Sequence, residues 1–377
     1  MRFDYKDIDV LGLIKWDWAN SGYRFTQSLK MLDLNAVSFK GTPLAYFNYP
    51  EQLPTLPILS EEPVRMYPIL NDVKHDTQLQ DLIMRSKVIY LFGTQMIENI
   101  NIPSNTKMVV QHGGRTYREA AAQCNKIFNP LVDATIAQCP DLLNLGAKNE
   151  HLIYYPVDTE LIKPDYVFKD PAKLIIGHFP SNPTNKGTEI ITAVIKKLKE
   201  SSLGDKFEYN GIPWLGNQHK KAHFVDWPDN LKRLNTSDII IETCKPSLNG
   251  KPFGEWGNTA IEGSASGKIV VTNSLTAELY AKEYGNTALQ INDGTPEGLE
   301  KSLVALLTMP REKILQRKKE ARRWVVEKHS IDATALRLWE KIFKHLFPNK
   351  WTEEGLKRHI INTWTHEYLQ IKGWNKQ

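Results

Sequence analysis

Short apolar strands alternate with amphipathic helical periods along this chain, and the alternation runs in two separate series. In the first series, "DVLGLI" (9–14) leads through a loop to a helical period with Phe25, Leu29 and Leu32, after which "NAVSF" returns to strand character. Further strands of this series are expected at "KVIYLF" (87–92), "KMVVQH" (107–112) and "ATIAQ" (134–138). Strands that alternate with helices form parallel sheets covered on both faces, so the predicted fold class is α/β.

The second series repeats this pattern from "KLIIGHF" (173–179) onward. A helical period with Ile191, Val194 and Leu198 follows this strand. Further strands are expected at "KFEYNG" (206–211), "AHFVDW" (222–227), "DIIIET" (238–243) and "KIVVTN" (268–273). Both series are therefore predicted to form doubly wound, Rossmann-like domains.

A connector separates the two series at "YYPVDTELIKP" (154–164), which has neither period and is bracketed by two prolines. The predicted domains are residues 1–156 and 157–345. Residues 346–377 are predicted to form one or two amphipathic helices whose tryptophans serve core packing.

Composition limits the classes of partner. The chain is only mildly basic, with a formal charge of +5 and a pI of 8.8, which suits an anionic ligand and argues against nucleic acid as a main partner. Its three cysteines form no CxxC pair, so neither a disulfide framework nor a zinc site is expected, and the expected location is the cytoplasm. No uncharged apolar stretch approaches the ~20 residues of a membrane span. The basic run at 311–328 contains interleaved acids and is interpreted as a solvated helix face, which leaves at most peripheral membrane contact.

Ligands of doubly wound sheets bind beyond the carboxyl ends of the strands, so the loops that follow strands are the candidate sites. In the first such loop, "HFPSNPTNKGTE", Lys186 stands just before a helix. Its charge opposes the positive end of the helix dipole unless an anion lies between them, which indicates a phosphate. A surface lysine that points to water is the alternative.

A second anion cradle is predicted in "GEWGNTAIEGSASGKIVVTN", where Gly254 and Gly257 offer backbone N–H groups at a helix start. Asn258 can cap this helix, and Gly267 can close it in the left-handed conformation. Two cradles suit a diphosphate, and Glu262, projecting from the flank of the helix, would then accept hydrogen bonds from a ribose diol. The alternative is that Glu262 only steadies the helix.

The third candidate loop is "QHGGR", where His112 ends a strand and two glycines let a ligand approach the backbone. A structural histidine is the alternative. No metal site is predicted, because His219 and His223 lie four residues apart without an obvious third ligand.

Taken together, these motifs and "DWANSGYRFTQSL", "CPDLL" and "YPVDTELIKP" resemble the ordered motifs of GT-B-fold glycosyltransferases, family 4 in particular, over roughly residues 8 to 345. The resemblance implies two Rossmann-like domains facing across a cleft, with a terminal helix that crosses back onto the first. It also implies retaining transfer of a sugar from a nucleotide diphosphate-sugar to an acceptor hydroxyl, without metal or another cofactor. The acceptor, whether glycan, lipid-linked or a small molecule, is not specified.

Residue by residue, the resemblance places Lys186 on the donor diphosphate, Glu262 on the ribose hydroxyls and His112 near the donor sugar. The other donor-side residues it implies are Ser181, Asn182, Gly254, Gly257, Asn258 and Thr259, and those near the acceptor or the phosphates are Asp17, Asn20, Ser21 and Arg115.

The chain departs from the family pattern at two positions. Gly254 stands where the family has an acid that touches the transferred sugar, and Glu255 is one place late, so Glu255 is taken as its substitute and, with His112, as a candidate catalytic residue. Ser181 stands where the family has an arginine. These departures leave open a catalytically silent binding or scaffold subunit and a sugar-nucleotide epimerase. A transferase acting on DNA bases is the third alternative, and the modest basicity argues against it.

Overall fold

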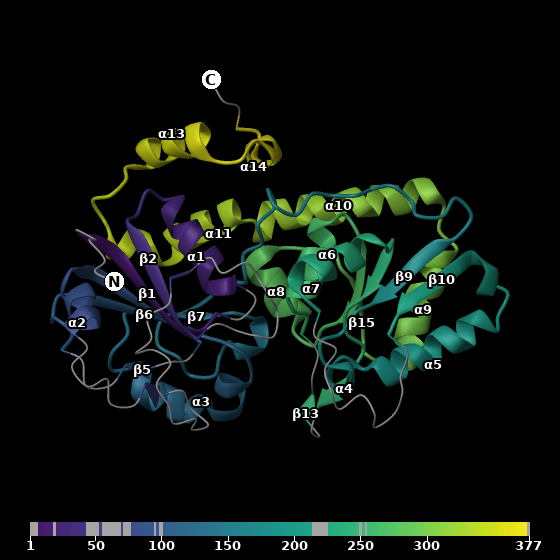
Figure 1. The fold of residues 1–377 in the computed structure, drawn as a ribbon, viewed down its shortest axis with the longest axis horizontal. Helices are drawn as coiled ribbons and strands as arrows, with labels where there is room; N and C mark the ends of the chain where they lie inside the picture. Colours follow the sequence, from purple (N-terminus) through teal and green to yellow (C-terminus); the bar gives the residue numbers. More distant parts are fainter. Residues whose placement is uncertain are drawn as a thin grey trace. The chain divides into compact units, whose positions relative to one another are not determined.

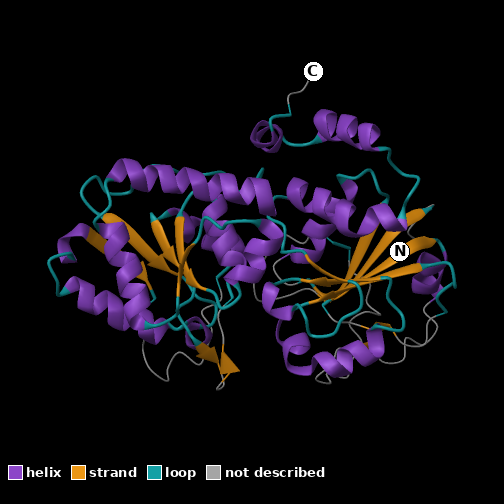
Figure 2. Ribbon diagram, turned by 180° about the vertical axis from the view of Figure 1, so that it is seen from behind, coloured by secondary structure: helices purple, strands orange, loops and turns teal. Residues whose placement is uncertain are grey.

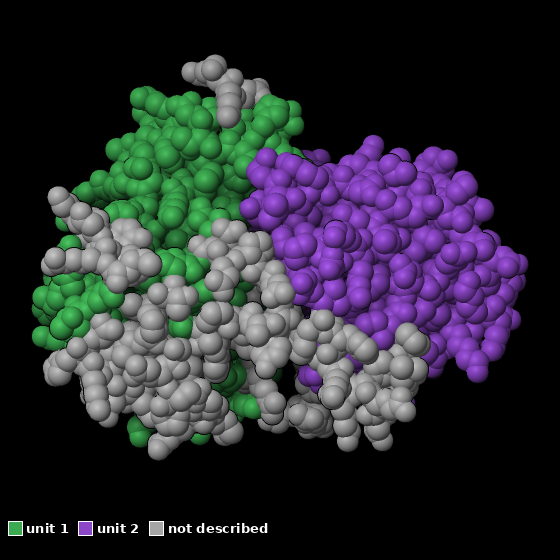
Figure 3. All heavy atoms as spheres, in the orientation of Figure 1, with its two compact units in different colours: residues 1–45, 50–156, 329–377 green, residues 46–49, 157–328 purple. Residues whose placement is uncertain are grey.

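The computed structural model describes residues 7–17, 20–42, 53–54, 69–70, 77–93, 96–97, 101–212, 225–248, 251–252 and 255–374. The chain divides into two compact units, coloured separately in Figure 3. Unit 1 comprises residues 1–45, 50–156 and 329–377, and unit 2 comprises 46–49 and 157–328. Residues 329–345, assigned to the second domain from the sequence, thus cluster with unit 1. One reason is that α11 (Ile331–Leu338) contacts α1 (Ser21–Lys30), with the Ser28 hydroxyl donating to the Ile331 carbonyl at 3.0 Å.

Unit 1 is built on a six-stranded parallel sheet (Figure 1). The strands, in spatial order, are β2 (Ala36–Thr42), β1 (Ile8–Trp16), β4 (Ser86–Phe92), β6 (Lys107–His112), β7 (Ala134–Ala137) and β8 (Glu150–Leu152). A separate parallel pair consists of β3 (Ile69–Leu70) and β5 (Met96–Ile97). The strand order of the main sheet reverses between β1 and β4, which is where ligands bind in doubly wound folds.

Successive strand residues point to opposite sides of this sheet, and apolar side chains lie on both sides, so helices cover both faces. One face packs against α2 (Thr77–Met84) and α3 (Gly114–Phe128). On the other face lies α1, whose Phe25 ring meets those of Tyr90 and Phe92 with centroids 6.2 and 6.1 Å away. The predicted helical period and strands of the first series are therefore confirmed.

Unit 2 is built on a five-stranded parallel sheet whose order reverses between β9 and β11. Its strands, in spatial order, are β10 (Phe207–Gly211), β9 (Leu174–His178), β11 (Ile239–Ile241), β14 (Ile269–Asn273) and β15 (Gln290–Asn292), and β12 (Ser247–Leu248) pairs separately with β13 (Lys251–Pro252). The helices are α4 (Pro183–Lys186), α5 (Thr188–Lys199), α6 (Trp227–Asn235), α7 (Asn258–Ala265), α8 (Ala277–Tyr284), α9 (Pro296–Leu307) and α10 (Arg311–His329).

Both faces of this sheet are also covered, as Figure 2 shows from behind. Helices α5 and α9 bury their apolar stripes against one face. On the other face α7 approaches so closely that a Cβ at Gly263 would lie 2.9 Å from Ile240 and 3.1 Å from Val270. The small residues of α7 therefore serve close helix-to-sheet packing, and Gly267 closes the helix with φ +72° as predicted.

Two local predictions in unit 2 are wrong. Residues 222–224 of the strand expected at 222–227 lie outside the described residues, and Trp227 begins α6 instead, since Pro228 suits the first turn of a helix. The N-cap of α7 is Gly257, with Asn258 as the first helical residue.

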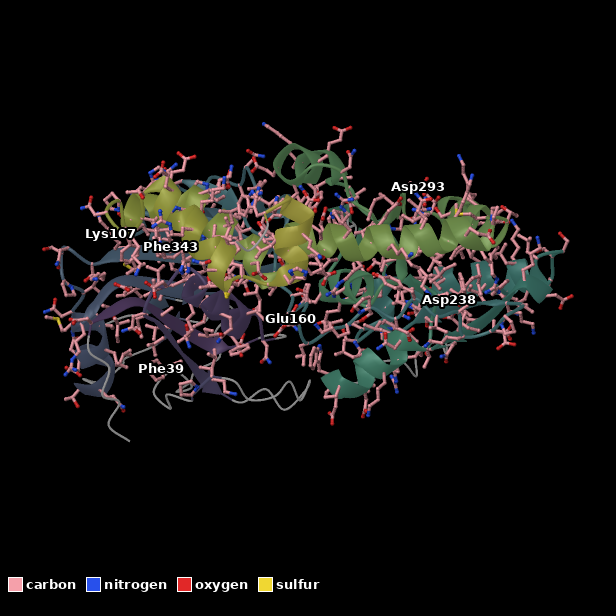
Figure 4. The ribbon with its side chains drawn as sticks, turned by 90° about the horizontal axis from the view of Figure 1, so that it is seen from above. Phe39, Lys107, Glu160, Asp238, Asp293 and Phe343 are labelled. Atoms are coloured by element: carbon pink, nitrogen blue, oxygen red, sulfur yellow. The ribbon has the colours of Figure 1, made fainter. Side chains whose placement is uncertain are left out.

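The basic run at 311–328 forms α10, but it is not simply a solvated face. Lys318 is fully buried and pairs at 3.1 Å with Asp238, which is labelled in Figure 4. Arg322 is also buried and donates to the carbonyls of Thr159, Ile162 and Ala265 at 2.7–2.9 Å. These cations bind the start of unit 2 to its core, a function that the charge pattern alone did not indicate. No helix in the described part of the chain combines the length and apolarity needed to cross a membrane.

The C-terminal segment packs on unit 1. It contains a π-helix (Trp339–Phe343), α12 (Lys344–Leu346), α13 (Glu353–Thr363) and α14 (His366–Lys372). The indole N–H groups of Trp351 and Trp364 donate to the carbonyls of Leu32 and Met31, each at 3.1 Å, and Trp364 is buried. These two tryptophans therefore fasten the segment to the end of α1.

Candidate functional site

The loops after β9 and β11 meet at the point where the strand order of unit 2 reverses. His178, the last residue of β9, donates from Nδ1 to the Ile241 carbonyl at 2.7 Å, and its Nε2 accepts from the Thr188 hydroxyl at 2.9 Å. Burial lowers the pKa of His178 to about 4, so the ring is neutral. His178 thus joins β9, β11 and α5 with a fixed tautomer.

A backbone contact holds the two loops together. The Cys244 N–H donates to the Lys186 carbonyl at 3.1 Å, and the Lys245 ammonium donates to the Thr184 carbonyl at 2.6 Å. Gly187 makes this approach possible, because a Cβ there would lie 1.8 Å from the Cys244 carbonyl oxygen. Its φ of +70° also favours glycine.

Lys186, at the end of α4, forms an ion pair with Glu242, which follows β11 directly. The Lys186 side chain is 23% exposed and the Glu242 side chain 1%. Lys186 Nζ also donates to the Thr243 hydroxyl at 3.0 Å. Glu242 Oε2 accepts from the Thr243 and Thr272 hydroxyls at 2.5 and 3.1 Å, and Oε1 accepts from the Gly257 N–H at 3.3 Å.

Glu242 is ionised despite its burial. Burial opposes the charged form, but the Lys186 ammonium and the hydrogen bonds from Thr243 and Thr272 hold the pKa of Glu242 below its ordinary value. The sequence predicted an anion near Lys186, and the structure supplies one from the protein itself. An acid placed immediately after a buried apolar strand, as in "DIIIE", was the signal for Glu242 that the sequence interpretation missed.

The N-terminus of α7 belongs to the same site. A Cβ built on Gly257, its N-cap, would lie 3.7 Å from Lys186 Nζ and 3.5 Å from Glu242 Oε1. Asn258 and Thr259 are the first two residues of α7, and both are half-buried. The structure therefore brings together the two anion cradles predicted from the sequence, with Glu242 between them.

The remaining donor-side residues are arranged differently from the expectation. Glu262 does not project from the flank of α7: it is 2% exposed and accepts from the Trp227 indole at 3.0 Å. Ser181 and Asn182 are exposed, and the Asn182 side chain caps α4 by accepting from the Asn185 N–H at 3.0 Å.

Gly254 and Glu255 mark the loop that was expected to contact the transferred sugar. The Glu255 carboxylate is buried and accepts hydrogen bonds from the Thr276 hydroxyl and, at 3.5 Å, from the Ser274 hydroxyl. Gly254 lies outside the described residues, as do His219 and His223. Among the residues that are described, no group of three His, Cys, Asp or Glu side chains is placed to hold a metal ion.

In unit 1, Asp17 lies at the carboxyl end of β1 and caps α1. Its carboxylate accepts from the Gly22 N–H at 2.7 Å and the Tyr23 N–H at 3.1 Å. Burial raises the pKa of Asp17 to about 6, against the opposing effect of these bonds. Asn20 precedes α1 in the left-handed conformation, and Ser21, its first residue, is buried.

His112 lies in the core of unit 1. It is fully buried, stacks on Tyr117 with centroids 3.9 Å apart and meets the Phe128 ring edge-on. Burial lowers the pKa of His112 to about 3, so it is neutral at physiological pH. This is the packing expected of a structural histidine. Arg115 lies in α3, and its side chain is outside the described part of the structure.

Comparisons with known proteins bear on the fold. No family model and no curated protein matches the sequence. A glycosyltransferase from Rickettsia africae is 14% identical with a TM-score of 0.57, covering 92% of this chain and 100% of its own. Anabaena HepE, solved in complex with UDP-glucose, is 12% identical with a TM-score of 0.52, covering 89% and 99%. A putative UDP-N-acetylglucosamine 2-epimerase from Listeria monocytogenes is 11% identical with a TM-score of 0.50, covering 93% and 99%. The predicted GT-B fold class is thereby confirmed.

Proposed function

We propose that this protein is a glycosyltransferase that moves a sugar from a nucleotide diphosphate-sugar to an acceptor hydroxyl. The observation that carries the proposal is the partly exposed Lys186 ammonium beside the N-terminus of α7, at the strand-order reversal of a GT-B fold. Ammonium groups and helix N-termini both bind phosphate oxygens. The UDP-glucose bound to the HepE neighbour agrees with a ligand of this class.

In this proposal the donor diphosphate binds to Lys186 and to the backbone N–H groups of Asn258 and Thr259. Glu262, one turn further along α7, is assigned to the ribose hydroxyls, and Glu255 to the transferred sugar. Family 4 membership, retention of configuration, independence of metal and a cytoplasmic location are parts of the same proposal. The acceptor class stays open between glycan, lipid-linked and small-molecule hydroxyls.

The chemistry follows from charge. The bond between the anomeric carbon and the donor phosphate oxygen breaks, and a bond from that carbon to the acceptor oxygen forms. Negative charge grows on the diphosphate, where a preorganised ammonium and helix N–H groups stabilise it. The leaving phosphate oxygen takes the acceptor proton, which requires no separate carboxylate base. His112 receives no proton-transfer role, because it is buried and neutral.

Calorimetric titration of UDP-, GDP-, ADP-, CMP- and dTDP-sugars without metal tests the donor site. Lys186→Met should weaken binding of the preferred donor by roughly 10- to 100-fold, since a hydrogen bond to a charged group contributes ~1.5–3 kcal/mol. Lys232→Met, on an exposed lysine of α6, is the matched control and should bind like the wild type. A folded wild-type protein that binds none of these compounds would refute the proposal.

Product analysis separates the alternatives that keep the fold. The Listeria neighbour makes epimerisation the second candidate, and an epimerase would convert the sugar nucleotide in the absence of any acceptor. A transferase leaves the donor sugar unchanged until an acceptor is added. A silent binding subunit would bind the donor and never turn it over, even when a broad set of acceptors is added.

A further inference from the structure

The Glu242 carboxylate is fixed in place beside the lysine that the donor is proposed to contact. Its two oxygens receive the Lys186 ammonium, two threonine hydroxyls and the Gly257 N–H, and its side chain is only 1% exposed. A surface glutamate could swing away when an anion arrives. Glu242 cannot do so without breaking bonds to β14 and to the start of α7.

We propose that Glu242 is a permanent counter-ion of Lys186, which weakens binding of the free nucleoside diphosphate more than binding of the nucleotide diphosphate-sugar. This inference rests on the proposed function, because it takes Lys186 to contact the terminal phosphate of the donor. It assigns Glu242 a role in discriminating product from substrate, acting through charge.

A phosphate bound to Lys186 would lie close to Glu242. A phosphate oxygen that accepts from an ammonium lies about 2.8 Å from it, and the Glu242 oxygen is held by the same ammonium, so the two anions lie within about 6 Å of each other. At that range like charges repel by enough to change affinity several-fold, even with strong screening. The repulsion scales with the charge on the terminal phosphate.

The two ligands differ in that charge. In the sugar nucleotide the terminal phosphate is esterified and carries one negative charge, whereas in the free diphosphate it has a second ionisation near pH 6 and carries about two. Bound product is therefore repelled about twice as strongly as bound donor. Breaking the sugar–phosphate bond makes Lys186 hold a group that Glu242 disfavours, which promotes release.

Calorimetric titration of Glu242→Gln tests the inference, since glutamine keeps an acceptor oxygen for Lys186 and Gly257 but removes the charge. The ligands are inorganic pyrophosphate, the nucleoside diphosphate and its sugar nucleotide. We expect the sugar nucleotide to bind about threefold more tightly than to the wild type, and the nucleoside diphosphate and pyrophosphate about tenfold more tightly.

Thr272→Val is the matched control, because it removes a hydrogen bond to the same carboxylate and keeps its charge. Its ratio of the two nucleotide affinities should equal that of the wild type. An unchanged ratio in Glu242→Gln, or weaker binding of the diphosphate, would show that Glu242 is only structural and overturn the inference. Thermal unfolding checks that each variant is folded, and Glu242→Met replaces the glutamine variant if that one does not fold.

Pyrophosphate separates this inference from the proposed function. If the wild type binds no nucleotide but Glu242→Gln binds pyrophosphate more tightly and Thr272→Val does not, the counter-ion role is upheld while the transferase proposal fails. If nucleotides bind and Glu242→Gln leaves their ratio unchanged, the transferase proposal stands and the counter-ion role fails. Failure of every form to bind pyrophosphate or nucleotide overturns both.

Discussion

Asp17 in unit 1 and Glu242 in unit 2 each follow a strand that flanks the reversal of strand order, β1 and β11, on opposite sides of the reversal. Both are buried, yet their ionisation is shifted in opposite directions. Asp17 accepts from two backbone N–H groups, and burial raises its pKa to about 6 although these bonds and the nearby Arg24 and Lys40 charges favour the ionised form. Glu242 receives the Lys186 ammonium, which outweighs burial and lowers its pKa. Burial therefore dominates the pKa of Asp17, whereas the Lys186 ammonium and the threonine hydroxyls dominate that of Glu242.

The buried histidines of the two units extend the comparison. His112 stacks on Tyr117 and meets Phe128 edge-on in unit 1, whereas His178 joins two strands and a helix through both ring nitrogens in unit 2. Burial keeps both rings neutral. The carboxyl edge of unit 2 is thus a bonded polar network around a retained ion pair, while the described candidates of unit 1 serve capping and core packing.

The largest expected loss of stability comes from disrupting the contact between the loops that follow β9 and β11 in unit 2. Gly187→Ala places a Cβ 1.8 Å from a backbone oxygen and at φ +70°, so we expect roughly 3 kcal/mol less free energy of unfolding. Gly373→Ala, at φ +67° in the same left-handed region with open space around it, is the control and should lose about 1 kcal/mol. Chemical denaturation measures both. Equal losses would mean that the approach of the two loops adds nothing beyond backbone strain.

A slightly smaller loss of stability is expected in acid, where unfolding allows His112 to become protonated. The pKa of His112 is about 3 when folded and 6.5 when unfolded, so its contribution to stability is complete above pH 6.5 and is lost as pH falls. Between pH 6 and pH 4 this amounts to about 2.5 kcal/mol. His112→Leu should remove that loss, as measured by hydrogen exchange of β6 amides at the two pH values. An unchanged acid dependence in the variant would contradict a buried neutral ring.

The contribution of Asp17 to stability should change with pH in the opposite direction to that of His112. Its folded pKa of about 6 exceeds the ordinary 3.8, so its contribution is complete below pH 3.8 and is lost as pH rises to 6, by about 2 kcal/mol between pH 4 and pH 6. Asp17→Asn should remove this term and steepen the acid sensitivity of unit 1 in the same exchange experiment. In the wild type the two residues nearly cancel. If Asp17→Asn and His112→Leu shift the profile in the same direction, the comparison with Glu242 fails.

Most of the fold could be predicted from the sequence, but only part of the candidate site. Strands such as 107–112 and 238–243 were predictable because apolar runs between turn signals are local. Lys186 could be singled out from the sequence because a cation just before a helix is unfavourable unless an anion lies nearby. Glu242, 56 residues away, was missed because its pairing depends on which strands become neighbours, and that is set by the whole sheet. The burial of Glu262 and Lys318 was missed for the same reason, since partners on α6 and beside β11 enclose them.

The smallest expected effect tests how firmly Glu242 is held. Thr272→Val keeps the shape of the side chain and removes the hydroxyl that donates to Glu242 Oε2, so about 1.5 kcal/mol of the free energy of unfolding should be lost. Thr308→Val, which removes an exposed hydroxyl at the end of α9, is the control and should change stability by less than about 0.5 kcal/mol. A loss no larger than the control would mean that Thr243 and Lys186 alone hold the carboxylate. Glu242 would then be free enough to yield to an incoming phosphate, and the contrast with Asp17 would reduce to a single ion pair.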